Sequence, residues 1–156
     1  MKDQYFLDFP DDSLMKNREM VDGKLHNRPS YYAFKDHGSK VYWMIPFSSK
    51  LIKFENEFNK KIAKNGICDT IAFGFVMGEK KAFLIQNMCP VTEEYIENEY
   101  IDKATGQAVQ VSESLQHELN TKAAKVLSLL RKGRNLIFPD VIAIEKVLLE
   151  KMKSVD

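Results

Sequence analysis

Two adjacent serines, Ser48 and Ser49, stand where an apolar run gives way to a lysine-bearing helical pattern, in the stretch WMIPFSSKLIKF (Trp43–Phe54). The first amide groups of a helix have no partner within the helix, so one serine could cap it. The same amides, with the positive end of the helix dipole, two hydroxyl groups and Lys50, could also hold a phosphate. The two interpretations are compatible, and the second predicts an oxyanion site at this junction.

Other catalytic chemistries have little support in the sequence. Neither serine lies in a GxSxG turn and no histidine is close to them, which disfavours a serine nucleophile. The three histidines, His26, His37 and His117, lack the spacing of metal ligands. Cys68 and Cys89 form no CxxC pair and are expected to be buried thiols. Nucleotide-binding glycine loops are absent as well, so we expect no metal and no other cofactor.

Charge is unevenly distributed along the chain, although the net charge is only +1. Residues 24–64 contain nine lysines and arginines against three acids, and residues 122–134 contain five against none. Residues 93–102 contain five acids and no base. These blocks could assemble a basic groove with acidic flanks, or they could be ordinary solvated faces.

The composition fits one globular domain spanning residues 1–156. Apolar residues make up 44% of the chain, and no repeat or linker divides it. The acidic N-terminal stretch lacks the basic start and apolar run of a signal peptide, and no window is apolar enough to span a membrane. We therefore expect a cytoplasmic protein.

Strand and helix patterns surround the two serines. The aromatic and β-branched runs Tyr31–Phe34 and Lys40–Phe47 predict a hairpin whose second strand is buried on both faces. From Leu51 the apolar residues recur at helical spacing until Asn65-Gly66 end the run. The serines are thus expected to lie between a central strand and a helix.

The remaining elements complete a mixed fold. A second hairpin is predicted from residues 70–77 and 81–88, and helical spacing predicts helices at 115–130 and from Pro139 onward. Weaker patterns predict a short strand at 5–9, a loop or helical turn at 11–26, and a third hairpin pairing 94–101 with 107–111. Strands joined by hairpins and mixed with helices predict an α+β fold with an antiparallel sheet.

Several motifs in this order resemble a known family. They are NRPSYYAF (27–34), KVYWMIPFSSK (40–50), a lysine-rich helix and FLIQNMCPV (83–91). This arrangement is similar to the ToxN/AbiQ endoribonuclease toxins of type III toxin-antitoxin systems, and within them to the CptN-like branch. The similarity spans most of the chain. It implies a compact, twisted, barrel-like antiparallel sheet surrounded by helices, related to the MazF/Kid/CcdB toxins.

The resemblance also implies an activity and partners. The activity is metal-independent RNA cleavage by 2′-OH attack, which leaves a 2′,3′-cyclic phosphate and a 5′-hydroxyl, with adenine-rich sites favoured in relatives. The substrates are cellular mRNA and the tandem-repeat precursor of a small pseudoknot antitoxin RNA. That RNA occupies a basic groove and inhibits the toxin in a closed protein–RNA hetero-oligomer. A role in phage defence is left open.

The family's catalytic hydroxyl pair carries over to Ser48 and Ser49, which would bind the non-bridging phosphate oxygens. Lys50, with Lys53 as a second candidate, would supply positive charge. The pattern departs from the family here, because relatives can place a residue between the serine and the lysine.

A second departure concerns the upstream proline, which relatives follow with a basic residue where this chain has Ser30. Arg28 or His26 is expected to take over that role. Tyr31 or Tyr32 would orient the scissile group or stack on a base. His117 is either a general acid or an ordinary helix residue. Contacts to antitoxin phosphates are expected from the acid-free basic run, which contains Lys122, Lys125, Arg131, Lys132 and Arg134.

Two other functions remain open from the sequence. A non-catalytic RNA-binding module would use the same basic surface and aromatic residues. A toxin that targets a protein such as gyrase could be built on the same small barrel.

Overall fold

The structure is a computed structural model that describes residues 1–35 and 39–155. Residues 36–38, where a turn was predicted and which include His37, lie outside the described residues. Within the described ranges, none of the helices combines the length and the apolar character needed to cross a membrane.

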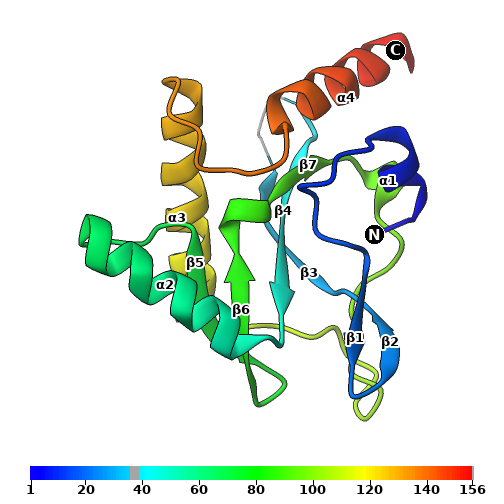
Figure 1. Cartoon of the computed structure of the whole chain (residues 1–156). Helices are drawn as coiled ribbons and strands as arrows, with labels where there is room; N and C mark the ends of the chain where they lie inside the picture. Colours follow the sequence, from blue (N-terminus) through cyan, green and yellow to red (C-terminus); the bar gives the residue numbers. More distant parts are fainter. Residues whose placement is uncertain (36–38, 156) are drawn as a thin grey trace.

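The fold is built around an antiparallel five-stranded sheet (Figure 1). Its strands are β3 (Ser30–Lys35), β4 (Tyr42–Ser48), β5 (Ile71–Val76), β6 (Glu79–Leu84) and β7 (Cys89–Val91). Strand β4 is central: β3 pairs with one edge, while β7 pairs with the first half of the other edge and β6 with its end. Residues 43–48 are all buried, as the apolar run on both faces predicts.

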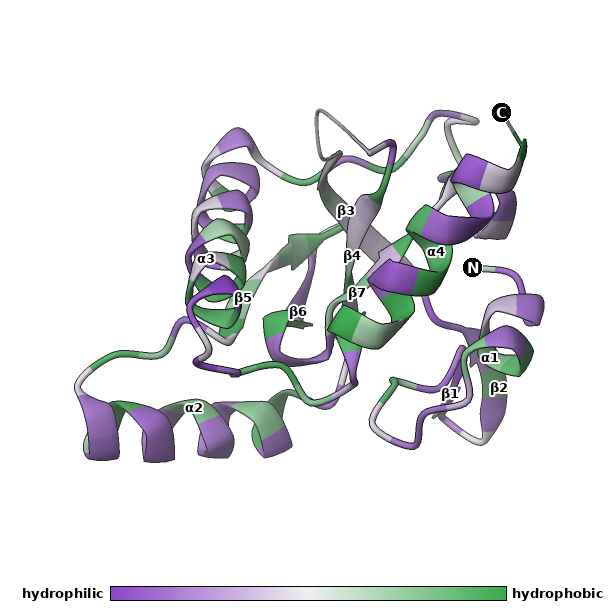
Figure 2. Ribbon diagram, turned by 90° about the horizontal axis from the view of Figure 1, so that it is seen from above, coloured by the Kyte–Doolittle hydropathy of each residue, from purple (hydrophilic) through white to green (hydrophobic). Residues whose placement is uncertain are grey.

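Helices cover both faces of the β5–β6 hairpin (Figures 1 and 2). Helix α2 (Leu51–Asn65) lies on one face, where the ring of Phe58 packs 5.4 Å from that of Phe73. Helix α3 (Glu113–Arg131) lies on the other, and a Cβ added at Gly74 would overlap with its Leu115 side chain. The glycine therefore lets α3 approach the strand closely.

Helix α4 (Val141–Val155) packs against β7 and closes the main hydrophobic core. That core joins buried residues of β4, β6, α3 and α4, including Trp43, Phe83, Leu119 and Leu148. A smaller cluster under α2 contains Phe54, Cys68, Ile71, Ala82 and Leu84. Both cysteines are free and buried, which confirms the expectation from their spacing.

The two central hairpins and the three long helices confirm the predictions made from periodicity. Helix α2 ends where predicted, because Gly66 adopts a left-handed conformation with φ 76° and its amide bonds to Ile62 O. The predicted α+β class with an antiparallel sheet is also confirmed.

The N-terminal predictions were wrong. Residues 5–9 fall within helix α1 (Gln4–Asp8) and its cap rather than in a strand, because the buried side chains Tyr5 and Phe9 are four residues apart. The segment 11–26 contains a hairpin of β1 (Arg18–Val21) and β2 (Lys24–Asn27), with positive φ at both Asp22 and Gly23. The β2 residues are all exposed, so no apolar alternation marks this hairpin in the sequence.

The extent of the predicted third hairpin, which paired 94–101 with 107–111, is also wrong. The 3₁₀ turn η2 (Glu93–Tyr95) occupies the start of the segment predicted to be extended at 94–101. In the second hairpin, the 3₁₀ turn η1 (Ile85–Asn87) replaces the end of the strand predicted at 81–88. Within the described residues, the 96–111 segment forms a single bridge between Ile101 and Ala108.

Candidate active site at the strand-to-helix junction

Ser49 is exposed and lies against a lysine from the neighbouring strand. The Nζ of Lys81 donates a hydrogen bond to Ser49 Oγ at 2.6 Å. Strand pairing explains the contact, because Ser48 is opposite Ala82 and Lys81 is next along β6. The Lys81 side chain is only 17% exposed and forms an ion pair with Glu79 at 3.1 Å. An ammonium group can only donate, so the proton of Ser49 Oγ is left for another acceptor.

Ser48, in contrast, is an interior residue with 1% of its surface exposed. Its hydroxyl donates to Glu19 Oε1 at 2.6 Å and accepts from the Lys50 amide at 3.2 Å. Successive residues of an extended chain point to opposite sides, which separates the environments of the two serines. The hydroxyl of Ser48 thus joins the end of β4 to β1.

Arg28 completes a buried charged group beneath the junction. Its Nη1 lies 3.4 Å from Glu19 Oε2, and the two side chains are 8% and 9% exposed. The guanidinium also donates to Phe47 O at 3.2 Å and to Lys16 O at 2.9 Å. Burial lowers the pKa of Arg28, and the Glu19 carboxylate opposes this shift. Arg28 is therefore held inside the protein by three partners.

The start of α2 differs from the expected serine cap. Lys50 occupies the N-cap position, and the Leu51 amide bonds to the backbone oxygen of Ser49 at 2.9 Å. The prediction that a serine side chain caps the helix is therefore wrong, since Ser48 Oγ binds the amide of Lys50 just before the helix begins. Lys50 and Lys53 are both exposed, and Lys53 Nζ lies 5.2 Å from the Phe54 ring centroid.

Four of the predicted site residues share a cavity of about 810 Å³ between β3 and the 96–110 segment. They are Arg28, Ser30, Tyr31 and Tyr32. This cavity therefore collects the predicted residues that precede β4 except His26, whereas Ser49 and Lys81 are not among its lining residues.

The two predicted tyrosines in this cavity, Tyr31 and Tyr32, are half-buried phenols. Tyr31 Oη donates to Asn120 Oδ1 of α3 at 3.4 Å, and burial raises its pKa. Tyr32 packs edge-on against Tyr42 with 6.2 Å between ring centroids, and burial with the nearby Cys89 raises its pKa to about 12. Both phenols stay protonated at neutral pH, which suits hydrogen bonding or stacking rather than proton abstraction.

The basic run 122–134 is acid-free in sequence but not in space. Lys122 contacts Glu118 at 3.2 Å and Lys125 contacts Asp69 at 2.7 Å. Arg131 makes two hydrogen bonds of 2.7 Å to Glu145. Lys132 and Arg134 are exposed just beyond the end of α3.

The two histidines among the described residues lie on different elements. His26 is exposed on β2, opposite Glu19 in the hairpin register, and His117 is exposed on α3. Among the described residues, no group of three or more His, Cys, Asp or Glu side chains is arranged to hold a metal ion.

Sequence reasoning missed Lys81 and Glu19, which contact the two serines. Lys81 had a signal, because it lies two residues before the buried Phe83 on the same face of β6. A lysine on an apolar strand face needs a polar partner. Glu19 had no such signal in the sequence, because the polar β1–β2 hairpin that contains it was not predicted.

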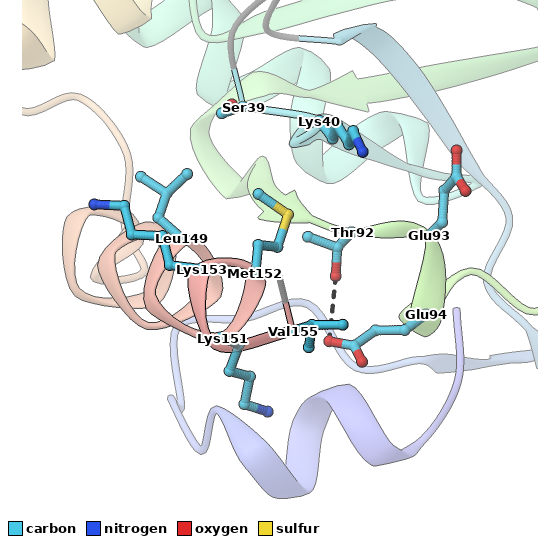
Figure 3. A pocket seen from close by; sticks show the side chains of 10 residues that line it. All are labelled: Ser39, Lys40, Thr92, Glu93, Glu94, Leu149, Lys151, Met152, Lys153 and Val155. Atoms are coloured by element: carbon cyan, nitrogen blue, oxygen red, sulfur yellow. Dashed lines mark hydrogen bonds between the residues drawn. The ribbon is translucent and has the colours of Figure 1, made fainter.

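A second hollow, of about 490 Å³, lies between α4 and the segment around Thr92 (Figure 3). It contains none of the predicted site residues. Lys151 lines it but extends toward α1, where its Nζ donates to Tyr95 Oη at 2.7 Å.

No protein-family model matches the sequence, and no curated protein matches it. Among solved structures, one match is described as "Structure and activity of AbiQ, a lactococcal anti-phage endoribonuclease belonging to the type-III toxin-antitoxin system". The TM-score is 0.64 over 97% of this chain and 94% of that chain.

The chain has the fold of AbiQ. Both share a curled antiparallel half-barrel sheet with helices packed around it, as the family resemblance implied. The identity with AbiQ is 13%, so the likeness establishes the fold alone.

Proposed function

We propose that this chain is an endoribonuclease toxin of a type III toxin-antitoxin system. The observation that carries the proposal is an exposed serine hydroxyl, hydrogen-bonded to a lysine ammonium group, at the strand-to-helix junction of a fold shared with an endoribonuclease. In this proposal the chain belongs to the CptN-like branch of the ToxN/AbiQ family and acts in the cytoplasm, where its mRNA substrates are.

The reaction is an internal transesterification. The ribose 2′-oxygen forms a bond to the adjacent phosphorus while the bond from phosphorus to the 5′-oxygen breaks. The 2′-hydroxyl loses its proton to solvent and the 5′-oxygen gains one. The products are a 2′,3′-cyclic phosphate and a 5′-hydroxyl, and no oxidant or metal enters the balance. The protein has to align the attack and stabilise negative charge on the phosphate oxygens.

Ser49 is positioned to supply a donor to a non-bridging oxygen, since its proton has no use in the bond with Lys81. The exposed Lys50 and Lys53 supply positive charge near Ser49, and so does the positive end of the α2 dipole. Ser48 and Arg28 act by positioning, because Glu19 holds both of them beneath the junction.

RNA beyond the scissile phosphate meets the cavity between β3 and the 96–110 segment, where Tyr31 or Tyr32 stacks on a base and Ser30 contacts the backbone. His26, which is exposed on β2 outside this cavity, is a further contact to the RNA backbone.

Within the basic run, the exposed Lys132 and Arg134 reach the antitoxin first. His117, exposed on α3 before the run, is a further contact. Lys122, Lys125 and Arg131 would have to exchange their acidic partners for phosphates.

The natural inhibitor in this proposal is a pseudoknot antitoxin RNA cut from tandem repeats. It covers the junction and assembles with the protein into a closed complex. The likeness to AbiQ supports an RNA partner of this kind, because AbiQ belongs to a type III system.

Substitution of Ser49 tests the function. A pool of randomised-sequence RNA should be cut by the wild-type chain to products with cyclic phosphate ends, while the matching DNA pool stays intact. Ser49→Ala should lower the single-turnover rate about 100-fold or more, the usual effect of removing one oxyanion donor. Ser128→Ala, at an exposed serine on α3, is the matched control and should cut like wild type.

The other functions predict different results. If the wild-type chain binds the RNA pool in a salt-dependent way but never cuts it, the protein is an RNA-binding module. If it neither binds nor cuts RNA yet remains toxic, a protein target is indicated. Either result contradicts the proposed nuclease.

A further inference from the structure

We infer that Lys81 is the lysine that acts with Ser49 on the scissile phosphate, in place of the candidates Lys50 and Lys53. The inference rests on the proposed function and names a catalytic residue that lies 32 positions from Ser49 in the chain.

The hydrogen bond between Lys81 and Ser49 fixes the direction in which each side chain can donate a proton. Lys81 has no acceptor to offer, so the oxygen of Ser49 accepts at 2.6 Å and the serine proton points away from the lysine. An ammonium group has three protons, and Glu79 engages only one side of it, at 3.1 Å. A phosphate oxygen beside Ser49 could then receive the serine proton and the lysine charge together.

The backbone and the partial burial of Lys81 prepare it for this role. Its strand position is fixed by the pairing of Gly74 with Lys81 and of Phe83 with Ala72, and α3 packs on Gly74 from the same face. With 17% of its side chain exposed, the charge of Lys81 is less screened by water than that of a fully solvated lysine. Lys50 and Lys53 are exposed, and Lys53 lies over the Phe54 ring.

The adjacent residue, Lys80, is a natural control. It points to the opposite face of β6, where its Nζ lies 3.3 Å from Glu55 of α2 and 5.3 Å from the Phe73 ring centroid. Both lysines carry the same charge on the same strand, and only Lys81 touches Ser49. If only the loss of a positive charge mattered, replacing Lys80 and replacing Lys81 would slow cleavage equally.

Lys81→Met and Lys80→Met should be compared on the most readily cleaved RNA from the randomised pool. Lys81→Met is expected to lower the single-turnover rate about 100-fold, whereas Lys80→Met stays close to wild type. Affinity for the same RNA with a 2′-deoxy group at the scissile position should change little in either variant. The double variant with Ser49→Ala should be about as slow as either single variant, because the two side chains act together.

Chemical rescue separates a lost charge from a damaged fold. In Lys81→Cys, 2-bromoethylamine alkylates the introduced thiol; a C–S bond forms, bromide leaves, and an ammonium group returns at nearly the original distance. The native Cys68 and Cys89 are 7% and 1% exposed and are protected. Rescue of cleavage by alkylation is expected for Lys81→Cys and not for Lys80→Cys.

The outcomes are distinct. If wild type cuts RNA and Lys81→Met cuts equally fast, or if alkylation of a folded Lys81→Cys restores nothing, Lys81 is not the acting lysine and the nuclease proposal survives. Loss of cleavage in Lys50→Met or Lys53→Met with Lys81→Met unaffected also overturns the inference. A wild-type chain that cuts no RNA overturns the proposed function together with the inference.

Discussion

Ser48 and Ser49 share a residue type and a place in the sequence, yet their surroundings give them different tasks. Ser48 Oγ is bound to Glu19 inside the protein, whereas Ser49 Oγ faces solvent beside Lys81. Glu19 is the common partner of Ser48 and Arg28, so one carboxylate neutralises a buried cation and orients a hydroxyl. This residue should matter more for stability than any surface acid.

Substitution of Glu19 by Gln tests that view. The amide still accepts from Ser48, but Arg28 loses its counter-ion in a buried place. The free energy of unfolding, measured by urea titration, should fall by about 3 kcal/mol. Glu55→Gln, which breaks an ion pair whose side chains are 43% and 42% exposed, should change it by less than about 1 kcal/mol. Equal effects in the two variants would show that Glu19 adds nothing beyond a surface pair.

At the scale of elements, helix α4 is fastened to α1 by a small polar network. Tyr95 Oη donates to Asp8 Oδ2 at 2.6 Å, and Lys151 Nζ lies 2.7 Å from Tyr95 Oη and 3.4 Å from Asp8 Oδ2. The Tyr95 hydrogen bond is the main cause that lowers the pKa of Asp8. The same tyrosine is the main cause that raises the pKa of Lys151.

The lowered pKa of Asp8 gives a stability effect with a definite sign. Its contribution is present above the ordinary aspartate value of 3.8 and is lost as pH falls through the lower pKa of the folded state. Asp8→Asn should therefore lower the melting temperature at neutral pH and have almost no effect in strong acid. The measurement is the melting temperature of the wild type and of Asp8→Asn from neutral pH to strong acid. A difference that persists unchanged in acid would contradict the role of the Asp8 charge.

Periodicity predicted the elements that have apolar faces and missed those that do not. The central strand β4 and helices α2 and α3 were predictable because their apolar residues repeat at strand or helix spacing. The β1–β2 hairpin was not, since β2 is exposed throughout. The position of the junction could likewise be predicted from the two serines. Which serine is exposed and which lysine contacts it could not, because these depend on contacts between residues that are 29 and 32 positions apart, Glu19 with Ser48 and Ser49 with Lys81.

For the whole molecule, paired charges matter more than the count of charges. The net charge is +1, and three cations of the run 122–134 are already bound to acids from other segments. The sequence showed the cations but not these partners, all of which lie outside the run: Glu118 is one helical turn before Lys122, whereas Asp69 and Glu145 come from distant segments. The exposed lysines near the start of α2 are then the more effective attractors of RNA.

Salt dependence of RNA binding tests this distribution. Each lysine that contacts a single-stranded phosphate contributes about 0.7 to the slope of log affinity against log salt. Lys50→Gln with Lys53→Gln should reduce the slope, measured with single-stranded RNA, while Arg131→Gln should leave it unchanged and lower thermal stability. A reduced slope in Arg131→Gln would mean that RNA displaces Glu145.

The two bonds that organise the junction join residues 19 with 48 and 49 with 81. Because each requires a distant strand to arrive, a nascent chain on the ribosome has no complete catalytic centre until β6 has emerged. If the proposed activity is correct, synthesis of the toxin does not endanger its own messenger before that moment. In the proposed function, the antitoxin RNA therefore has the time of translation in which to meet its partner.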